Sequence, residues 1–230
     1  TYNSMLVKQD GRLWKTGLVE TDYDTGDVRL LQRSFFRLTT LSGVTAMDSK
    51  TNHSIVLLQN GSVYAKGTNR EGQLGDGSTT DGSTTDRLNY VQVVSSGAKA
   101  VAAGSRHSMM LKQDGSVWVT GSNLHGQLGD GSTADRSSFV EVKSSGAKAV
   151  AAGFGHTMIL THDGGVWATG WNLYGQFGDG SITSTSVFIQ VETLGDSLGH
   201  DNLARTKTLL SSDFSVITKA SFPGQKTTIF

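Results

Sequence analysis

Residues 101–121, VAAGSRHSMMLKQDGSVWVTG, and residues 150–170, VAAGFGHTMILTHDGGVWATG, are two copies of one unit, and they decide the fold. In each copy, short apolar runs flank an Asp-Gly pair. This pair is a strong signal for a β-hairpin, because a type I′ turn needs positive φ at both central residues. The runs are rich in Val, Met, Leu and Trp, a composition that favours strands over helices. The two stretches therefore predict antiparallel hairpins.

The same turn recurs along the whole chain. Its acidic or amide residue falls at positions 10, 60, 114, 163 and 213, and the longest step contains a duplicated Asp-Gly-Ser-Thr-Thr pentapeptide. Further short apolar runs precede and follow each hairpin, so that each unit holds about four strands, the content of one β-propeller blade. We therefore predict an all-β chain of tandem four-stranded blades of about 50 residues, forming a partial or small β-propeller of about four to five blades.

The units differ in how well they keep the repeated sequence. Residues 1–41 form an incomplete first repeat, within which the segment 18–41 is divergent. Residues 42–194 carry well-kept repeats, whereas residues 195–230 read as a degenerate last repeat and tail. We expect the whole chain, 1–230, to form a single repeat domain.

Composition excludes several classes of function. The 20 Lys and Arg residues balance 20 Asp and Glu residues, so the chain lacks the basic excess of a nucleic-acid-binding protein. Cysteine is absent, which rules out disulfides and thiolate catalysis. The sequence contains no run of 18 apolar residues, so it predicts no transmembrane helix. We expect a soluble chain without a cofactor, from which any targeting segment is already absent. The compartment stays open, and peripheral attachment to a membrane complex is compatible with the sequence.

Two motifs that recur in register resemble those of the regulator of chromosome condensation repeat family. The first spans residues 101–111 and 150–160 and centres on a histidine. The second, Asn-x-x-Gly-Gln-Leu-Gly-Asp-Gly, occupies residues 69–77 and 123–131, and residues 172–180 differ from it by a Phe for the Leu. The resemblance is strong over residues 42–192. It implies a propeller of four-stranded blades, usually seven in that family, whereas five hairpins cannot supply seven blades.

Three histidines, His53, His107 and His156, suggest a metal site at first sight. They occupy one position in successive copies, however, and blade symmetry would hold them apart around a ring. We therefore expect a structural role, in which each ring bonds a neighbouring loop because buried polar groups need partners. Gly104 and Gly153 are structural repeat positions of the same motif. The Gly-Asp-Gly-Ser runs offer one carboxylate each, too few for calcium, so no metal is expected.

The divergent segment 18–41 is the best candidate for a partner-binding site. Aromatic and arginine residues are enriched in binding hot spots. We nominate the following residues of this kind: Tyr23, Arg29, Arg33, Phe35, Phe36, Arg37 and, on a separate loop, Trp171. The alternative for the segment is a diverged blade edge whose apolar residues belong to the core. Trp118 and Trp167 share the strand position after the turn, which predicts core or inter-blade packing.

These features favour a non-catalytic protein-protein interaction or scaffold module that is a subunit of a larger assembly and whose partners are proteins. Two alternatives follow from the resemblance. The first is guanine-nucleotide exchange on a small GTPase, the founding activity of the family. The second is a secreted inhibitor of a hydrolase, because similar Asp-Gly-Ser-Val-Trp repeats occur in such inhibitors.

Overall fold

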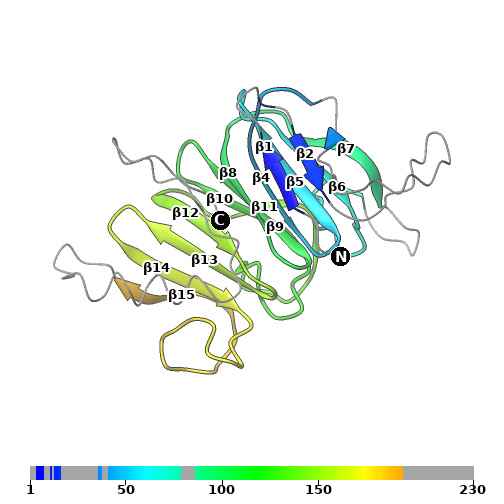
Figure 1. Cartoon of the computed structure of the whole chain (residues 1–230). Coiled ribbons are helices and arrows are strands. Elements are labelled where there is room, and N and C mark those ends of the chain that lie inside the picture. The colour runs from blue at the N-terminus through cyan, green and yellow to red at the C-terminus, as the bar shows by residue number, and fades with distance from the viewer. Residues whose placement is uncertain are drawn as a thin grey trace. The chain divides into compact units, whose positions relative to one another are not determined.

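The computed structural model describes residues 4–7, 11, 13–16, 36–37, 41–78 and 86–193. Every regular element in these residues is a β-strand, and the strands form one three-stranded and three four-stranded antiparallel sheets (Figure 1). The prediction of tandem four-stranded blades is confirmed. This part of the chain holds no helix that could cross a membrane. The fifth predicted repeat lies outside the described residues.

Each sheet is formed by consecutive strands. The first sheet contains β1 (Ser4–Val7), β2 (Leu13–Thr16) and β3 (Phe36–Arg37), and the second contains β4 (Val44–Lys50), β5 (His53–Leu58), β6 (Val63–Gly67) and β7 (Arg87–Val94). The third contains β8 (Ala98–Ala103), β9 (His107–Lys112), β10 (Val117–Gly121) and β11 (Arg136–Lys143), and the fourth contains β12 (Ala147–Ala152), β13 (His156–Thr161), β14 (Gly165–Gly170) and β15 (Thr185–Thr193).

The central hairpin of each sheet has a different turn from the expected one. β9 and β10 pair from Leu111 and Val117 outward, and Lys112 N donates to the carbonyl of Ser116. Only Gly115 has a positive φ, of 82°, so the turn is not type I′. Asp114 Oδ1 accepts hydrogen bonds from both the amide and the hydroxyl of Ser116. This arrangement matches a three-residue loop that ends in a left-handed glycine, a common alternative in hairpins.

Successive sheets pack face to face (Figure 1). The second strand of one sheet contacts the first strand of the next, as β5 contacts β8 and β9 contacts β12. The buried side chains consequently belong to cores shared between sheets: Ile55 and Leu57 pack with Met110, and Leu111 packs with Ile159. Trp118 and Trp167 are half-buried against these two shared cores, in agreement with the predicted packing register.

The loop that follows the third strand of a sheet forms hydrogen bonds with the next sheet. Gly77 N donates to Ser137 O at 2.9 Å, and Asp76 forms a bridge with Ser138 of β11. One repeat later, Gly131 N donates to Ser186 O at 2.9 Å in the same way. The repeated loops are therefore part of the inter-sheet contact.

The chain divides into two compact units, Thr1–Asp196 and Ser197–Phe230. All described elements belong to the first unit. The second unit lies outside the described residues, as does the predicted degenerate repeat and tail, residues 195–230.

Candidate functional site

The loops after β10 and β14 are held rigidly by a buried asparagine. Asn123 Oδ1 accepts the amide of Leu128 at 3.0 Å, and Asn172 Oδ1 accepts the amide of Phe177 at 2.9 Å. Both asparagines are fully buried. Because the asparagine and the leucine or phenylalanine point inward, the two residues after each asparagine are directed outward.

These outward residues form an exposed apolar patch together with the turn before β13. Trp171 lies at its centre, with ring centroids 5.2 Å from His125 (stacked), 5.9 Å from Phe154 and 5.4 Å from Tyr174. Tyr174 is 80% exposed and Phe154 is 62% exposed. Leu124 and Leu173, which adjoin this cluster in sequence, are also exposed. We call His125, Phe154, Trp171 and Tyr174 the aromatic surface.

The preceding repeat shows why the aromatic surface forms at one junction and not at the other. Arg106 at the turn before β9 pairs with Glu71 at 3.3 Å, so an ion pair occupies this place between the second and third sheets. At the next junction Gly155 takes the place of Arg106, and His125 takes the place of Glu71. A Cβ atom on Gly155 would lie 3.1 Å from the His125 ring and 3.5 Å from Trp171 Cβ. The missing side chain therefore leaves room for the two rings to stack.

The three repeat histidines are buried, and His53 and His107 lie at separate junctions between sheets. His53 Nε2 lies 3.0 Å from Ser108 Oγ of the third sheet, and His107 Nε2 lies 3.0 Å from Thr157 Oγ1 of the fourth. Burial lowers the pKa of His53 to about 4, against a smaller opposing contribution from the backbone of His107. Burial also lowers the pKa of His107 to about 3, and neighbouring positive groups act in the same direction. The rings of His53 and His107 are therefore neutral at pH 7, and each of the two links neighbouring sheets.

The glycine of the His motif is required by the position of the ring. A Cβ atom on Gly104 would lie 2.1 Å from Cε1 of His107, and one on Gly153 would lie 2.0 Å from Cε1 of His156. The imidazole thus lies directly over the glycine. Gly-x-x-His is therefore a packing motif in these two copies.

The Gly-Asp-Gly-Ser loops use their carboxylates internally. Asp76 pairs with Arg87 at 2.6 Å, and Asp130 pairs with Arg136 at 2.6 Å. Partial burial would raise the pKa of Asp130, but hydrogen bonds from Ser132 and Arg136 hold it below its ordinary value. The described residues contain no group of three His, Asp or Glu side chains placed to hold a metal ion.

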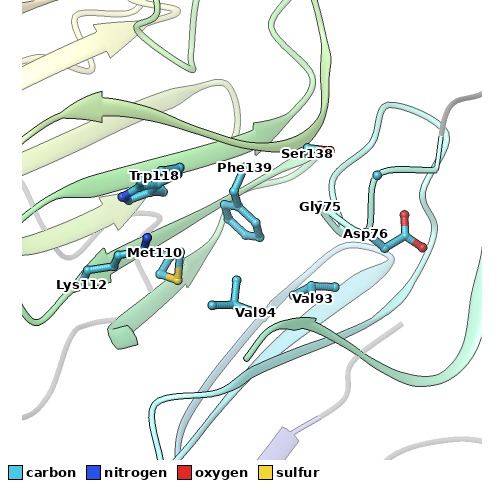
Figure 2. Close-up of a pocket in the computed structure, with 10 residues that line it drawn as sticks. Gly75, Asp76, Val93, Val94, Met110, Lys112, Trp118, Ser138 and Phe139 are labelled. Carbon is cyan, nitrogen blue, oxygen red and sulfur yellow. The ribbon is translucent and has the colours of Figure 1, made fainter. Parts of the chain in front are cut away.

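A groove of about 330 Å³ lies between the second and third sheets. Val93 and Val94 line one side, and Met110, Trp118 and Phe139 line the other (Figure 2). Between the third and fourth sheets, the position of Val94 is taken by Lys143, whose Nζ lies 5.6 Å from the Trp167 ring. Asp76, Lys112 and Ser138 also line the groove. Lys112 Nζ lies 3.8 Å from the centroid of the Trp118 ring and Asp76 pairs with Arg87, so both charged groups are already engaged within the chain.

Only some of the nominated binding residues lie among the described residues. Tyr23, Arg29, Arg33 and Phe35 lie outside the described residues. Phe36 and Arg37 form β3, whose backbone pairs with Lys15 and Trp14 of β2. Trp171 lies in the aromatic surface. The sequence analysis missed its three partners, His125, Phe154 and Tyr174, because they occupy repeat positions. Comparing the copies at loop positions, where Ser105 becomes Phe154 and Glu71 becomes His125 and Tyr174, would have found them.

Known proteins share the repeat. Two profiles of the Regulator of chromosome condensation (RCC1) repeat match this chain, one at residues 44–73, 98–127 and 147–176 and the other at residues 60–111 and 114–160. Together they cover more than half of the chain.

Similar curated proteins are much longer than this chain. Protein RCC2 homolog of Xenopus laevis is 31% identical over 132 residues, which is 55% of this chain and 25% of that protein. E3 ubiquitin-protein ligase MYCBP2 of Danio rerio is 43% identical over 78 residues, which is 34% of this chain and 2% of that protein. The chain thus spans a quarter or less of these relatives.

A solved structure shares the fold. Prp20p of Saccharomyces cerevisiae superposes with a TM-score of 0.65 at 19% identity, covering 84% of this chain and 49% of that one. With the profile matches, the repeated Gly-x-x-His and Asn-x-x-Gly-Gln-Leu-Gly loops and the four-stranded sheets, this shows that the chain belongs to the family of proteins built from RCC1 repeats.

Proposed function

We propose that this chain is a non-catalytic protein-binding module whose aromatic surface contacts the partner. The observation that carries this proposal is the contact of Trp171 with three other rings, two of which belong to strongly exposed residues. Large aromatic side chains are enriched in binding hot spots, and exposed apolar clusters mark interaction sites. The buried asparagines fix the loops that carry His125, Trp171 and Tyr174 before binding, which lowers the entropic cost of association.

The arrangement of the polar residues supports a role without catalysis. His53 and His107 lie at different junctions, and the hydroxyl beside each belongs to the neighbouring sheet. Neutral, buried rings that link sheets are unsuited to exchange protons with a substrate. MYCBP2 is named a ligase, but the matched segment is 2% of that protein, so its activity is not transferred to this chain.

Protein partners are supported by the comparison with Prp20p, whose structure report concerns its binding to Gsp1p and histones. We propose that this chain likewise acts by binding proteins, as a subunit of a larger assembly. The divergent segments 18–41 and 195–230 are proposed as further contact regions.

The test is capture of partners from the native source with the tagged full chain and a matched double variant. Trp171→Ser and Phe154→Ser install the residues that the preceding repeat carries at these positions, Ser122 and Ser105, so the loops should keep their structure. We expect the double variant to lose the partner and Leu88→Ala, an exposed residue of β7, to retain it. Equal capture by all three proteins would refute the proposal. Accelerated nucleotide release from a small GTPase would favour the exchange-factor alternative instead.

A further inference from the structure

The loops around the aromatic surface are acidic. Residues 121–135, 153–155 and 171–184 contain three aspartates and neither lysine nor arginine. Asp130 is neutralised by Arg136. Asp135 and Asp179 are exposed, and within the described residues neither forms an ion pair.

Both free carboxylates are tied to the asparagine loops that carry the rings. Asp135 Oδ1 accepts the amide of Asn123 at 2.7 Å, two residues before His125. Asp179 lacks the arginine found in the two earlier copies, because Thr185 stands at the start of β15 where Arg136 begins β11. Partial burial would raise the pKa of Asp179, but hydrogen bonds from Ser181 and Asn172 hold it below its ordinary value. The carboxylate is therefore ionised at neutral pH.

Aromatic rings elsewhere in the structure have a lysine over their faces. Lys112 Nζ lies 3.8 Å from the centroid of Trp118, and the rings of Trp167 and Tyr90 have similar lysine partners at 5.6 and 5.3 Å. Among the described residues, no lysine or arginine lies over the rings of the aromatic surface. The rings of the strongly exposed Phe154 and Tyr174 are thus open to a cation from outside.

We propose that the aromatic surface binds a cationic segment of a protein partner, with an arginine or lysine side chain over the exposed rings and Asp135 and Asp179 beside it. The negative face of an aromatic ring attracts a cation, most strongly for tryptophan, and nearby carboxylates add to that attraction. This inference rests on the proposed function and names the chemistry of the partner. A cationic segment is favoured over an uncharged one because only a cationic segment supplies a counter-charge to the two carboxylates.

The direct test compares two synthetic peptides on the full chain by isothermal titration calorimetry at low salt. Acetyl-Gly-Arg-Gly-Arg-Gly-amide supplies guanidinium groups, and the same peptide with citrulline keeps the shape without the charge. We expect the arginine peptide to bind about tenfold more tightly, a difference within the range of cation–π interactions. Equal affinity for the two peptides, or binding of neither, would overturn the inference.

Charge variants test the role of the carboxylates. The double variant Asp135→Asn with Asp179→Asn should bind the arginine peptide about fivefold more weakly at low salt. The difference should be smaller at high salt, because salt screens exposed charges. Asp86→Asn is the matched control: Asp86 accepts the amide of Asn69 as Asp135 accepts that of Asn123, but it belongs to the preceding repeat. An equal effect of the control and the double variant would contradict the assignment.

The two proposals fail separately. If partner capture depends on Trp171 and Phe154 but the peptides bind equally, the cationic partner is wrong and the binding module stands. If the serine variant captures its partner normally, the module itself is wrong.

Discussion

Acidification should destabilise the sheets through two buried histidines, His53 and His107. Their pKa values in the folded chain are about 4 and about 3, whereas an unfolded histidine titrates near 6.5. The unfolded state therefore binds protons more readily, so stability is full above pH 6.5 and falls as the pH decreases. At pH 5 each histidine should reduce the free energy of unfolding by about 2 kcal/mol relative to pH 8, and the pair by about 4 kcal/mol.

This loss is a large fraction of the stability of a typical domain. It is measured by urea denaturation of the full chain between pH 8 and pH 5, followed by tryptophan fluorescence. Aspartates with lowered pKa values, such as Asp130, lose their contribution to stability only as the pH falls below about 4. They therefore do not affect the change in stability between pH 8 and pH 5. His107→Gln should lower stability at pH 8 and reduce the loss between pH 8 and pH 5 by about half. Equal stability at both pH values, or an unchanged loss in the variant, would refute the reasoning.

Three further predictions concern single positions, each checked by the midpoint of thermal or urea unfolding. Gly153→Ala should cost about 2–3 kcal/mol because its Cβ would lie 2.0 Å from the His156 ring, whereas Gly146→Ala, with nothing within 4 Å, should cost about 1 kcal/mol through its positive φ; equal costs would contradict the packing argument. Asp130→Ala should cost about 1–2 kcal/mol because Asn123 and Ser132 lose their acceptor, and Leu88→Ala should be nearly neutral. Val94→Phe should raise stability by about 1 kcal/mol by filling the groove in Figure 2; a decrease would show that the groove cannot accept a ring.

The sequence was sufficient to predict the architecture because its signals are local and repeated. Asp-Gly pairs between short apolar runs marked the hairpins, and the period of about 50 residues marked the sheets. The turn type was wrong because the Asp-Gly rule assumes a two-residue loop, whereas Lys112 pairs with Ser116 across three residues. That difference depends on hydrogen bonds between Asp114 and Ser116, which a dipeptide rule does not include.

The candidate site was only partly predictable. Trp171 was nominated because it stands on a loop, but its contact with His125 requires the third and fourth sheets to pack face to face. His125, Phe154 and Tyr174 were not nominated because they occupy repeat positions, and residues at repeat positions were expected to have structural roles. In the structure the residue two positions after the asparagine differs between copies, His125 against Tyr174, while the buried asparagines Asn123 and Asn172 are the same.

Site-specific photo-crosslinking tests the central claim most directly. A benzoyl-phenylalanine in place of Tyr174, which is 80% exposed at the aromatic surface, is compared with one in place of Leu88, which is 64% exposed on β7. With the full chain in its native source, we predict a crosslink to a partner protein from position 174 and none from position 88. A partner that crosslinks from position 88 and not from position 174 would contradict binding through the aromatic surface.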